Sequence, residues 1–391
     1  MKKIILIFLI LFGFLAFGDE IDDIILESQT NLEREKDLIE GEYEVIYEEP
    51  IELNPYTKEG LKGAIECEFD IYSNEGLLKN QLHYEFKNGP INDITAKFGT
   101  KGFFIQNLSN DKSLNYDTRL ITLSTYGKFK SKKEGYSLLF DLTPMHDNFF
   151  HRLVLDAYIE SNRIKNNKII IGTSRPTVGI EGGISSYLTP LFYKSQTARN
   201  FGHIRKTGLR VLGDYKYFDY DIGGYSSDTR YTQFFPGVET DLWFGAKPLA
   251  KFDDKYGKLY LAGGSNIGSR NSKDFNVVSS AIRYDYKKLW FQGEYQRANG
   301  SNGYSGITRK KREGFNLTLG CNLTKKLEII ARFDDFNKDK KIKHTNSKEY
   351  TAGINYYIFG QCLRLIVNYV YCQNQMAKNS HRLIFGTQII L

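Results

Sequence analysis

The sequence predicts an all-β fold, a transmembrane antiparallel β-barrel, and three observations lead to this prediction. From Gly63 to the C-terminus, apolar and polar residues alternate with a period of two, which is typical of strands with one apolar face. The chain has 27 Tyr and 27 Phe but 3 Met and 8 Pro, a composition that favours pleated surfaces. Its N-terminus reads as an export signal, and a mean hydropathy of -0.42 excludes a helical membrane protein.

Residues 1–18 have the three parts of a secretory signal peptide. Lys2 and Lys3 precede an apolar run from Ile4 to Phe17, and the small residues Ala16 and Gly18 occupy the -3 and -1 positions before Asp19. A spanning helix normally needs about 20 apolar residues, so this run is short for an anchor. We therefore expect cleavage and export.

Residues 19–60 form an acidic segment that precedes the barrel. They contain fifteen carboxylates and three bases, a net charge of -12. Partly heptad spacing and a glycine at Gly41 predict one short amphipathic helix, which either associates with copies from neighbouring subunits or stays partly disordered. An extended linker with Pro50 and Pro55 follows it. The whole chain carries +7 and the signal +2, so residues 61–391 carry +17.

The alternation continues through eighteen segments of residues 61–391. In Leu327–Phe333, for example, Leu327, Ile329, Ala331 and Phe333 oppose Glu328 and Arg332. We predict sixteen strands, within a range of 14 to 18, because an even number returns both ends of the barrel to the periplasm. The segments are 63–71, 82–86, 94–106, 118–130, 135–142, 153–160, 168–173, 208–215, 218–226, 241–250, 258–266, 275–286, 289–297, 313–322, 327–334, 349–359, 361–371 and 381–391.

The last segment favours a membrane barrel over a soluble sandwich or propeller. His381–Leu391 places Leu383, Phe385, Thr387 and Ile389 on one face and ends the chain there, as in the terminal strand of outer-membrane barrels, although Leu391 stands where an aromatic residue is usual. Closure removes the exposed edges that so many strands would create. Sixteen strands share 331 residues, about 21 each with its connection, and a barrel of that width encloses an aqueous lumen.

A basic stretch from Arg163 to Arg210 holds nine bases and one carboxylate, Glu181. It contains a segment too long for an ordinary hairpin, which we expect to fold into the lumen. Rings of Arg and Lys lower the barrier for anions that have lost part of their hydration. The candidate constriction residues are therefore the bases in or after this segment and those that alternation points inward: Lys194, Arg199, Arg205, Lys206, Arg210, Arg332 and Arg364. Alternatively these bases face lipopolysaccharide or pair with lumen carboxylates such as Glu66, Glu68, Asp156 and Glu328.

The layout around the basic stretch resembles the phosphate-selective porin O and P family. The features that carry the resemblance are a strand ending at Gly172, then Pro176, Ser185-Ser186, Leu188-Thr189, Arg199, Gly202, the Arg205–Gly208 turn and a strand pair after it. The similarity spans roughly residues 60–391 in layout and is specific only within residues 168–226. The resemblance implies a sixteen-stranded trimeric porin with a loop in the lumen and a ladder of bases that conducts anions. It assigns no individual arginine as a ligand.

Enzyme and metal motifs are missing from the sequence. It has no G-x-S-x-G, H-E-x-x-H, Walker or Cys-x-x-Cys pattern, so we expect no enzymatic activity and no metal or other cofactor. Cys67, Cys321, Cys362 and Cys372 are expected to be packing residues, since Cys362 and Cys372 lie about 33 Å apart on one strand.

The sequence therefore predicts an outer-membrane porin of a Gram-negative-type bacterium. We expect passive diffusion of small hydrophilic solutes, with a preference for anions and phosphate among them. Its partners would be outer-membrane lipid and lipopolysaccharide, two further copies in a homotrimer and small anionic solutes, and export disfavours nucleic acid. The alternatives are a structural or adhesive barrel with a blocked lumen, and a porin for sugars or carboxylates.

Overall fold

Seventeen strands and two short helices make up the described part of the computed structural model, residues 82–109, 114–143, 153–202, 205–227, 237–248, 256–303, 306–375 and 378–391. The strands are β1 (His83–Glu85), β2 (Asp93–Asn107), β3 (Leu114–Lys128), β4 (Glu134–Asp141), β5 (Val154–Ser161), β6 (Asn167–Ser174), β7 (Lys206–Asp214), β8 (Phe218–Ser226), β9 (Val238–Ala246), β10 (Lys258–Arg270), β11 (Lys273–Tyr286), β12 (Leu289–Gly303), β13 (Gly306–Asn322), β14 (Leu327–Asn337), β15 (Asn346–Phe359), β16 (Leu363–Asn374) and β17 (Ser380–Ile390). The helices are α6 (Ile180–Gly183) and α7 (Gln196–Phe201). The expected signal peptide, the acidic segment 19–60 and the expected strand 63–71 lie outside the described residues.

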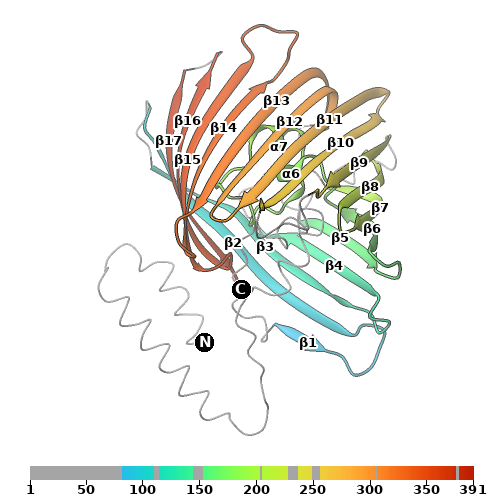
Figure 1. Cartoon of the computed structure of the whole chain (residues 1–391). Coiled ribbons are helices and arrows are strands. Elements are labelled where there is room, and N and C mark those ends of the chain that lie inside the picture. The colour runs from blue at the N-terminus through green and yellow to red at the C-terminus, as the bar shows by residue number, and fades with distance from the viewer. Residues whose placement is uncertain are drawn as a thin grey trace, which may run out of the picture. The chain divides into compact units, whose positions relative to one another are not determined.

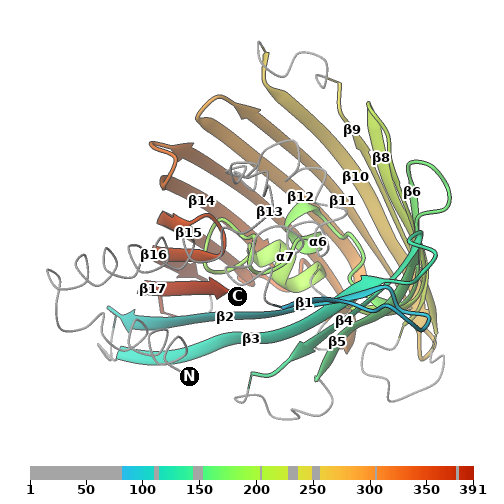
Figure 2. The ribbon, with the colours of Figure 1, turned by 90° about the horizontal axis from the view of Figure 1, so that it is seen from below.

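Strands β2 to β17 close into a sixteen-stranded antiparallel barrel, which confirms the predicted fold and strand number (Figures 1 and 2). Each strand pairs with the next, and β17 pairs with β2 from Arg382↔Asn107 to Ile390↔Gly99. The short β1 pairs with β2 at Asp93–Thr95, beyond the point where β17 ends. Phe98 and Leu391 exchange backbone hydrogen bonds at that junction. Strand β1 thus continues the wall past the C-terminus.

Side chains divide between the two faces of the wall in the way a lipid-embedded barrel requires. In β15, Glu349, Thr351 and Asn355 are buried on the inner face, whereas Tyr350 and Ile354 are 43% and 46% exposed on the outer face. The other strands repeat this pattern. A closed barrel satisfies its backbone groups internally, so its outer face can be apolar throughout. Among the described residues, no helix has the length and apolar character needed to cross a bilayer.

The connections define two rims. Leu391 lies at the C-terminal rim, together with the connections β1–β2, β3–β4, β5–β6, β7–β8, β9–β10, β11–β12, β13–β14 and β15–β16. The remaining connections lie at the opposite rim. One of these is the two-residue turn Asn271-Ser272, whose positive φ values of 51° and 57° match a type I′ hairpin. Strand length varies around the barrel, from 8 or 9 residues in β4–β9 to 13–17 in β10–β13.

Candidate functional site

The described part of the connection between β6 and β7, residues 175–202 and Arg205, lies against the inner face of the barrel, and we call it the inner segment. Figures 1 and 2 show its helices α6 and α7 enclosed by the ring of strands. Leu191 is fully buried against Trp290 and Ile330. Phe192 packs 4.5 Å from the ring of Phe103, from centroid to centroid. Burying a large apolar side chain contributes about 1.5–3 kcal/mol, so several such contacts hold the segment firmly.

Glycine and a serine cap shape the inner segment locally. The Ser195 hydroxyl accepts a hydrogen bond from the Ala198 amide and so caps α7. Helix α7 ends at Phe201, and Gly202 follows as its C-cap, where a Cβ atom would lie 2.6 Å from the Cα of Gly182. The two helices therefore pack through glycine backbones. Gly179 precedes α6 with a φ of 75°, a conformation that favours glycine.

A buried network of carboxylates fixes the two helices to β12 and β14. Glu294 accepts a hydrogen bond from the backbone amide of Glu181 at 2.9 Å. The Glu181 carboxylate accepts one from the Ser195 amide at 2.8 Å and lies 3.1 Å from Nη1 of Arg332. Arg332 Nε lies 2.8 Å from Asp334, which also accepts from the backbone amide of Gln196. One arginine therefore serves both the inner segment and the wall.

Side-chain amides of the opposite wall bind the rest of the inner segment. Asn368 accepts from the amide of Phe192 at 2.7 Å, and Asn355 donates to the carbonyl of Pro190 at 2.7 Å. Asn316 donates to the hydroxyl of Thr197 at 2.7 Å. These contacts hold the middle of the segment between β13 and β16.

Five of the seven candidate bases are paired with carboxylates. Arg199 lies 2.6 Å from Glu349, and Arg332 belongs to the network described above. The remaining three lie together at the start of β7 and immediately before it. Their partners are Asp156 for Arg205, at 2.9 and 3.3 Å, Glu239 and Asp241 for Lys206, and Asp221 for Arg210, at 2.8 and 2.7 Å.

The other two candidates bind neutral oxygens. Lys194 donates to the carbonyl of Ile184 at 2.5 Å, within the inner segment. Arg364, on β16, donates through Nη2 to the carbonyl of Thr189 at 3.1 Å and to Gln388 at 3.0 Å. Its Nε and Nη1 atoms are buried and have no hydrogen-bond partner among the described residues. The seven candidates thus form three groups, around Glu181, along β7 and at Arg364.

Lys101 on β2 is a buried base that sequence reasoning missed. Its Nζ donates to the carbonyl of Ser186 at 2.9 Å and lies 4.9 Å from the centroid of the Phe192 ring. Lys101 and Arg364 therefore hold the same part of the inner segment from neighbouring sides. The sequence feature that could have identified Lys101 is its position in a predicted strand, where it shares the inner face with Gly99 and Phe103.

The interior does not carry the basic excess of the sequence. Among the buried side chains of the described residues there are thirteen carboxylates and nine bases. The excess is instead concentrated at the rims. The described residues of the C-terminal rim turns include no carboxylate and twelve bases: Lys87, Lys130, Lys132, Lys133, Arg163, Lys165, Lys216, Lys247, Lys287, Lys288, Lys325 and Lys326.

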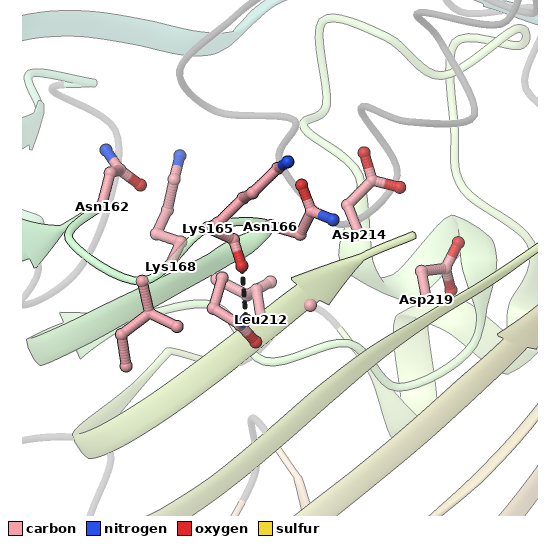
Figure 3. Close-up of a pocket in the computed structure, with 10 residues that line it drawn as sticks. Asn162, Lys165, Asn166, Lys168, Leu212, Asp214 and Asp219 are labelled. Carbon is pink, nitrogen blue, oxygen red and sulfur yellow. Dashed lines mark hydrogen bonds between the residues drawn. The ribbon is translucent and has the colours of Figure 1, made fainter. Parts of the chain in front are cut away.

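A pocket of about 220 Å³ lies at this rim, between the β5–β6 turn and strands β7 and β8. Figure 3 shows the amines of Lys165 and Lys168 on one side of it and the carboxylates of Asp214 and Asp219 on the other. Mixed charges of this kind give no strong preference for one ion. Within the described ranges, no three His, Cys, Asp or Glu side chains are placed to hold a metal ion.

Known structures share this architecture at low sequence identity. OmpF of Salmonella typhi, in a complex with daunomycin, matches with a TM-score of 0.59 and 12% identity over 79% of this chain and 100% of the other. An anion-selective porin from Comamonas acidovorans matches with a TM-score of 0.58 and 12% identity, over 76% and 99%. OmpT of Vibrio cholerae, folded in vitro and in a trimer form, matches with a TM-score of 0.50 and 10% identity, over 76% and 99%.

Comparison with protein families finds one family whose model matches part of the chain. No curated protein matches the chain significantly. The model of the family phosphate-selective porin O and P matches residues 270–389, from the end of β10 to the end of β17. The features that made the resemblance specific lay within residues 168–226, so the match rests on a different part of the barrel. The chain has the fold of outer-membrane porins, and over residues 270–389 it matches the phosphate-selective porin O and P family.

Proposed function

We propose that this protein is a passive diffusion channel of the outer membrane for small hydrophilic solutes, with a preference for small anions and phosphate among them. The closed barrel, with its apolar outer face and polar inner face, supports the channel. The family match and the fold shared with an anion-selective porin support the class of solute. The signal peptide at residues 1–18 would deliver the chain to the periplasm.

The observation that carries the anion preference is the basic C-terminal rim. Buried carboxylates outnumber buried bases among the described residues, so the bases inside the barrel add little net positive field along the path of an ion. The rim turns contain twelve bases and no carboxylate among their described residues, and carboxylates at the adjoining strand ends pair with two of these bases, Arg163 and Lys247. A mouth with an excess of one charge raises the local concentration of counter-ions and thereby their entry rate. Anion preference would arise at this mouth before an ion reaches the inner segment.

Inside the barrel, the seven candidate bases would act as a weaker second filter. Arg364 stands out among them because the oxygens that it binds are neutral, but its side chain is fully buried, so an anion would reach it only if the inner segment moved. A guanidinium presents a planar fork that suits phosphate oxygens. The bases already paired with carboxylates would bind a passing anion only by releasing those partners.

The test is the reversal potential of single channels in a KCl gradient across a planar bilayer. We expect chloride to be preferred over potassium. Charge reversal of Lys132, Lys133, Lys287 and Lys288 to Glu should shift the reversal potential towards potassium. The paired variant Lys340→Gln with Glu313→Gln, at the opposite rim, removes one charge of each sign and should leave it unchanged. Potassium preference in the unmodified protein would refute the anion proposal while leaving the channel intact.

A barrel with a closed lumen is the second candidate, and the packing of the inner segment favours it. Hydrophobic clusters join this segment to β2, β12, β14 and β16, on several sides of the interior. Such a protein would serve a structural or adhesive role and would show no conductance in the same bilayer experiment.

The orientation and assembly follow from the same proposal. Both ends of the chain would lie on the periplasmic side, with the C-terminal rim facing the periplasm and the opposite rim facing the cell exterior. We propose a homotrimer, which one of the similar structures adopts. The acidic helix expected in residues 19–60 would then meet its copies in the periplasm. Native mass spectrometry of the purified protein distinguishes a trimer from a monomer.

A further inference from the structure

The outer surface of β13–β17, near the opposite rim, combines an aromatic row with a band of bases. The aromatic row consists of Phe333, Tyr350, Tyr371 and His381, which are direct cross-strand neighbours on four adjacent strands. Their ring centroids lie 5.1, 5.9 and 4.6 Å apart in that order. All four are on the outer face, where aromatic residues mark the boundary between the hydrocarbon and the headgroups of a bilayer.

The basic band lies immediately beyond this row, towards the rim. Lys348 is two residues from Tyr350 on β15, so it shares the outer face about 7 Å further along. The β14–β15 connection folds over β13, where the amide of Lys340 donates to the carbonyl of Lys311 at 2.7 Å. The band comprises Arg309, Lys311, Lys338, Lys340, Lys341, Lys343 and Lys348.

Carboxylates neutralise the basic band only in part. Lys340 contacts Glu313, and Lys348 lies 4.0 Å from Asp335. Asp339 is buried and accepts a hydrogen bond from the backbone amide of Lys341. Seven bases therefore stand against three carboxylates. Exposed pairs of this kind are individually weak, so several phosphate groups on one ligand would be needed to occupy the surface.

We propose that this surface binds a polyphosphorylated lipid of the outer leaflet, with acyl chains on the aromatic row and phosphates on the basic band. The inference rests on the proposed orientation, which places the opposite rim at the outer leaflet. A lipid satisfies both halves of the surface at once, whereas free phosphate satisfies only the bases. Lipopolysaccharide, through its lipid A part, has this chemistry.

The probe is diphosphoryl lipid A, added to the full-length protein in detergent and counted by native mass spectrometry. We expect binding, and a loss of affinity of at least about tenfold when Lys311, Lys340, Lys343 and Lys348 are changed to Glu. The matched control carries the same four-fold reversal at Lys132, Lys133, Lys287 and Lys288 on the C-terminal rim, and it should bind normally. Equal losses in both variants would overturn the proposal, because they would indicate general attraction.

Two further arms identify the source of the phosphate. Lipid A without its phosphates should bind at least about tenfold more weakly, and equal binding would also overturn the proposal. Millimolar inorganic phosphate should leave lipid binding in place, and full displacement would mean that the surface recognises phosphate alone. Barrel content by circular dichroism checks that both variants fold. Channel conductance is recorded separately, so a failure of lipid binding is distinct from a failure of the proposed channel.

Discussion

Replacing Arg332 by Met should release the inner segment from the wall. Arg332 is buried and neutralises both Glu181 and Asp334. Its loss leaves two buried carboxylates without their cation, and breaking a buried pair in this way costs about 3–5 kcal/mol. Each 1.4 kcal/mol is about tenfold in an equilibrium constant, so the docked state of the segment should weaken by roughly 10² to 10³.

Thiol labelling at Thr197 measures that equilibrium. Thr197 is fully buried in α7, and a cysteine placed there, in a chain whose four native cysteines are replaced, reacts only when the segment opens. The rate of labelling by a membrane-impermeant maleimide should rise by the same factor in the Arg332→Met protein. An unchanged rate would refute the assigned role of the network.

Two controls accompany this experiment. Arg163→Met removes an arginine whose side chain is 66% exposed and whose partner is Glu134, so labelling at position 197 should not change. The triple variant Glu181→Gln, Arg332→Met and Asp334→Asn removes the stranded charges as well. The labelling rate of this variant should return most of the way to the slow rate of the unmodified protein. The reason is that the free energy lost in Arg332→Met arises from unpaired buried carboxylates.

Three further predictions test the wall and the mouth. Ile354→Arg, at the middle of the outer face of β15, should destabilise the barrel by about 2–4 kcal/mol in denaturant titrations in lipid vesicles, whereas Ile342→Arg in the β14–β15 connection should have little effect. Gly208→Ala should reduce folded yield, because its Cβ would lie 2.0 Å from the carbonyl oxygen of Gly224, whereas Gly224→Ala meets open space and should fold normally. The anion preference should weaken between about 0.1 M and 1 M KCl, as the screening length falls from about 10 Å to 3 Å, and a preference independent of salt would locate its source deep in the lumen.

Period-two alternation predicted the strands of the wall and the face that each side chain takes. This signal is strong because a shift of one residue in the register would move every side chain of a strand to the other face. Arg210, Arg332 and Arg364 were expected on the inner face and are buried there. Seventeen of the eighteen predicted segments correspond in order to β1–β17, and the eighteenth lies outside the described residues. The closed barrel has sixteen strands and not seventeen, because β1 continues the wall beside β2 without taking part in closure.

The partners of the bases could not be read from the sequence in the same way. Glu181 and Arg332 are 151 residues apart, and they meet only because the inner segment crosses the interior. Asp156 was named as a partner for a base and does pair with Arg205. Glu328 was named too, but it accepts hydrogen bonds from Trp290 and Tyr357. Alternation assigns a face, whereas a partner depends on the register between strands and on the path of the connection.

The uneven height of the wall has a consequence for the surrounding membrane. Strands β6 and β7 have only 8 and 9 residues, and both end where the chain turns into the inner segment. At about 3.3 Å per residue and a tilt of about 40°, they rise roughly 20 Å, less than the apolar band of about 25 Å on such barrels. This hydrophobic mismatch must be met by local thinning of the bilayer or by a neighbouring protein. The barrel therefore has one side on which contact with lipid is unfavourable, and that side would turn inward when copies assemble.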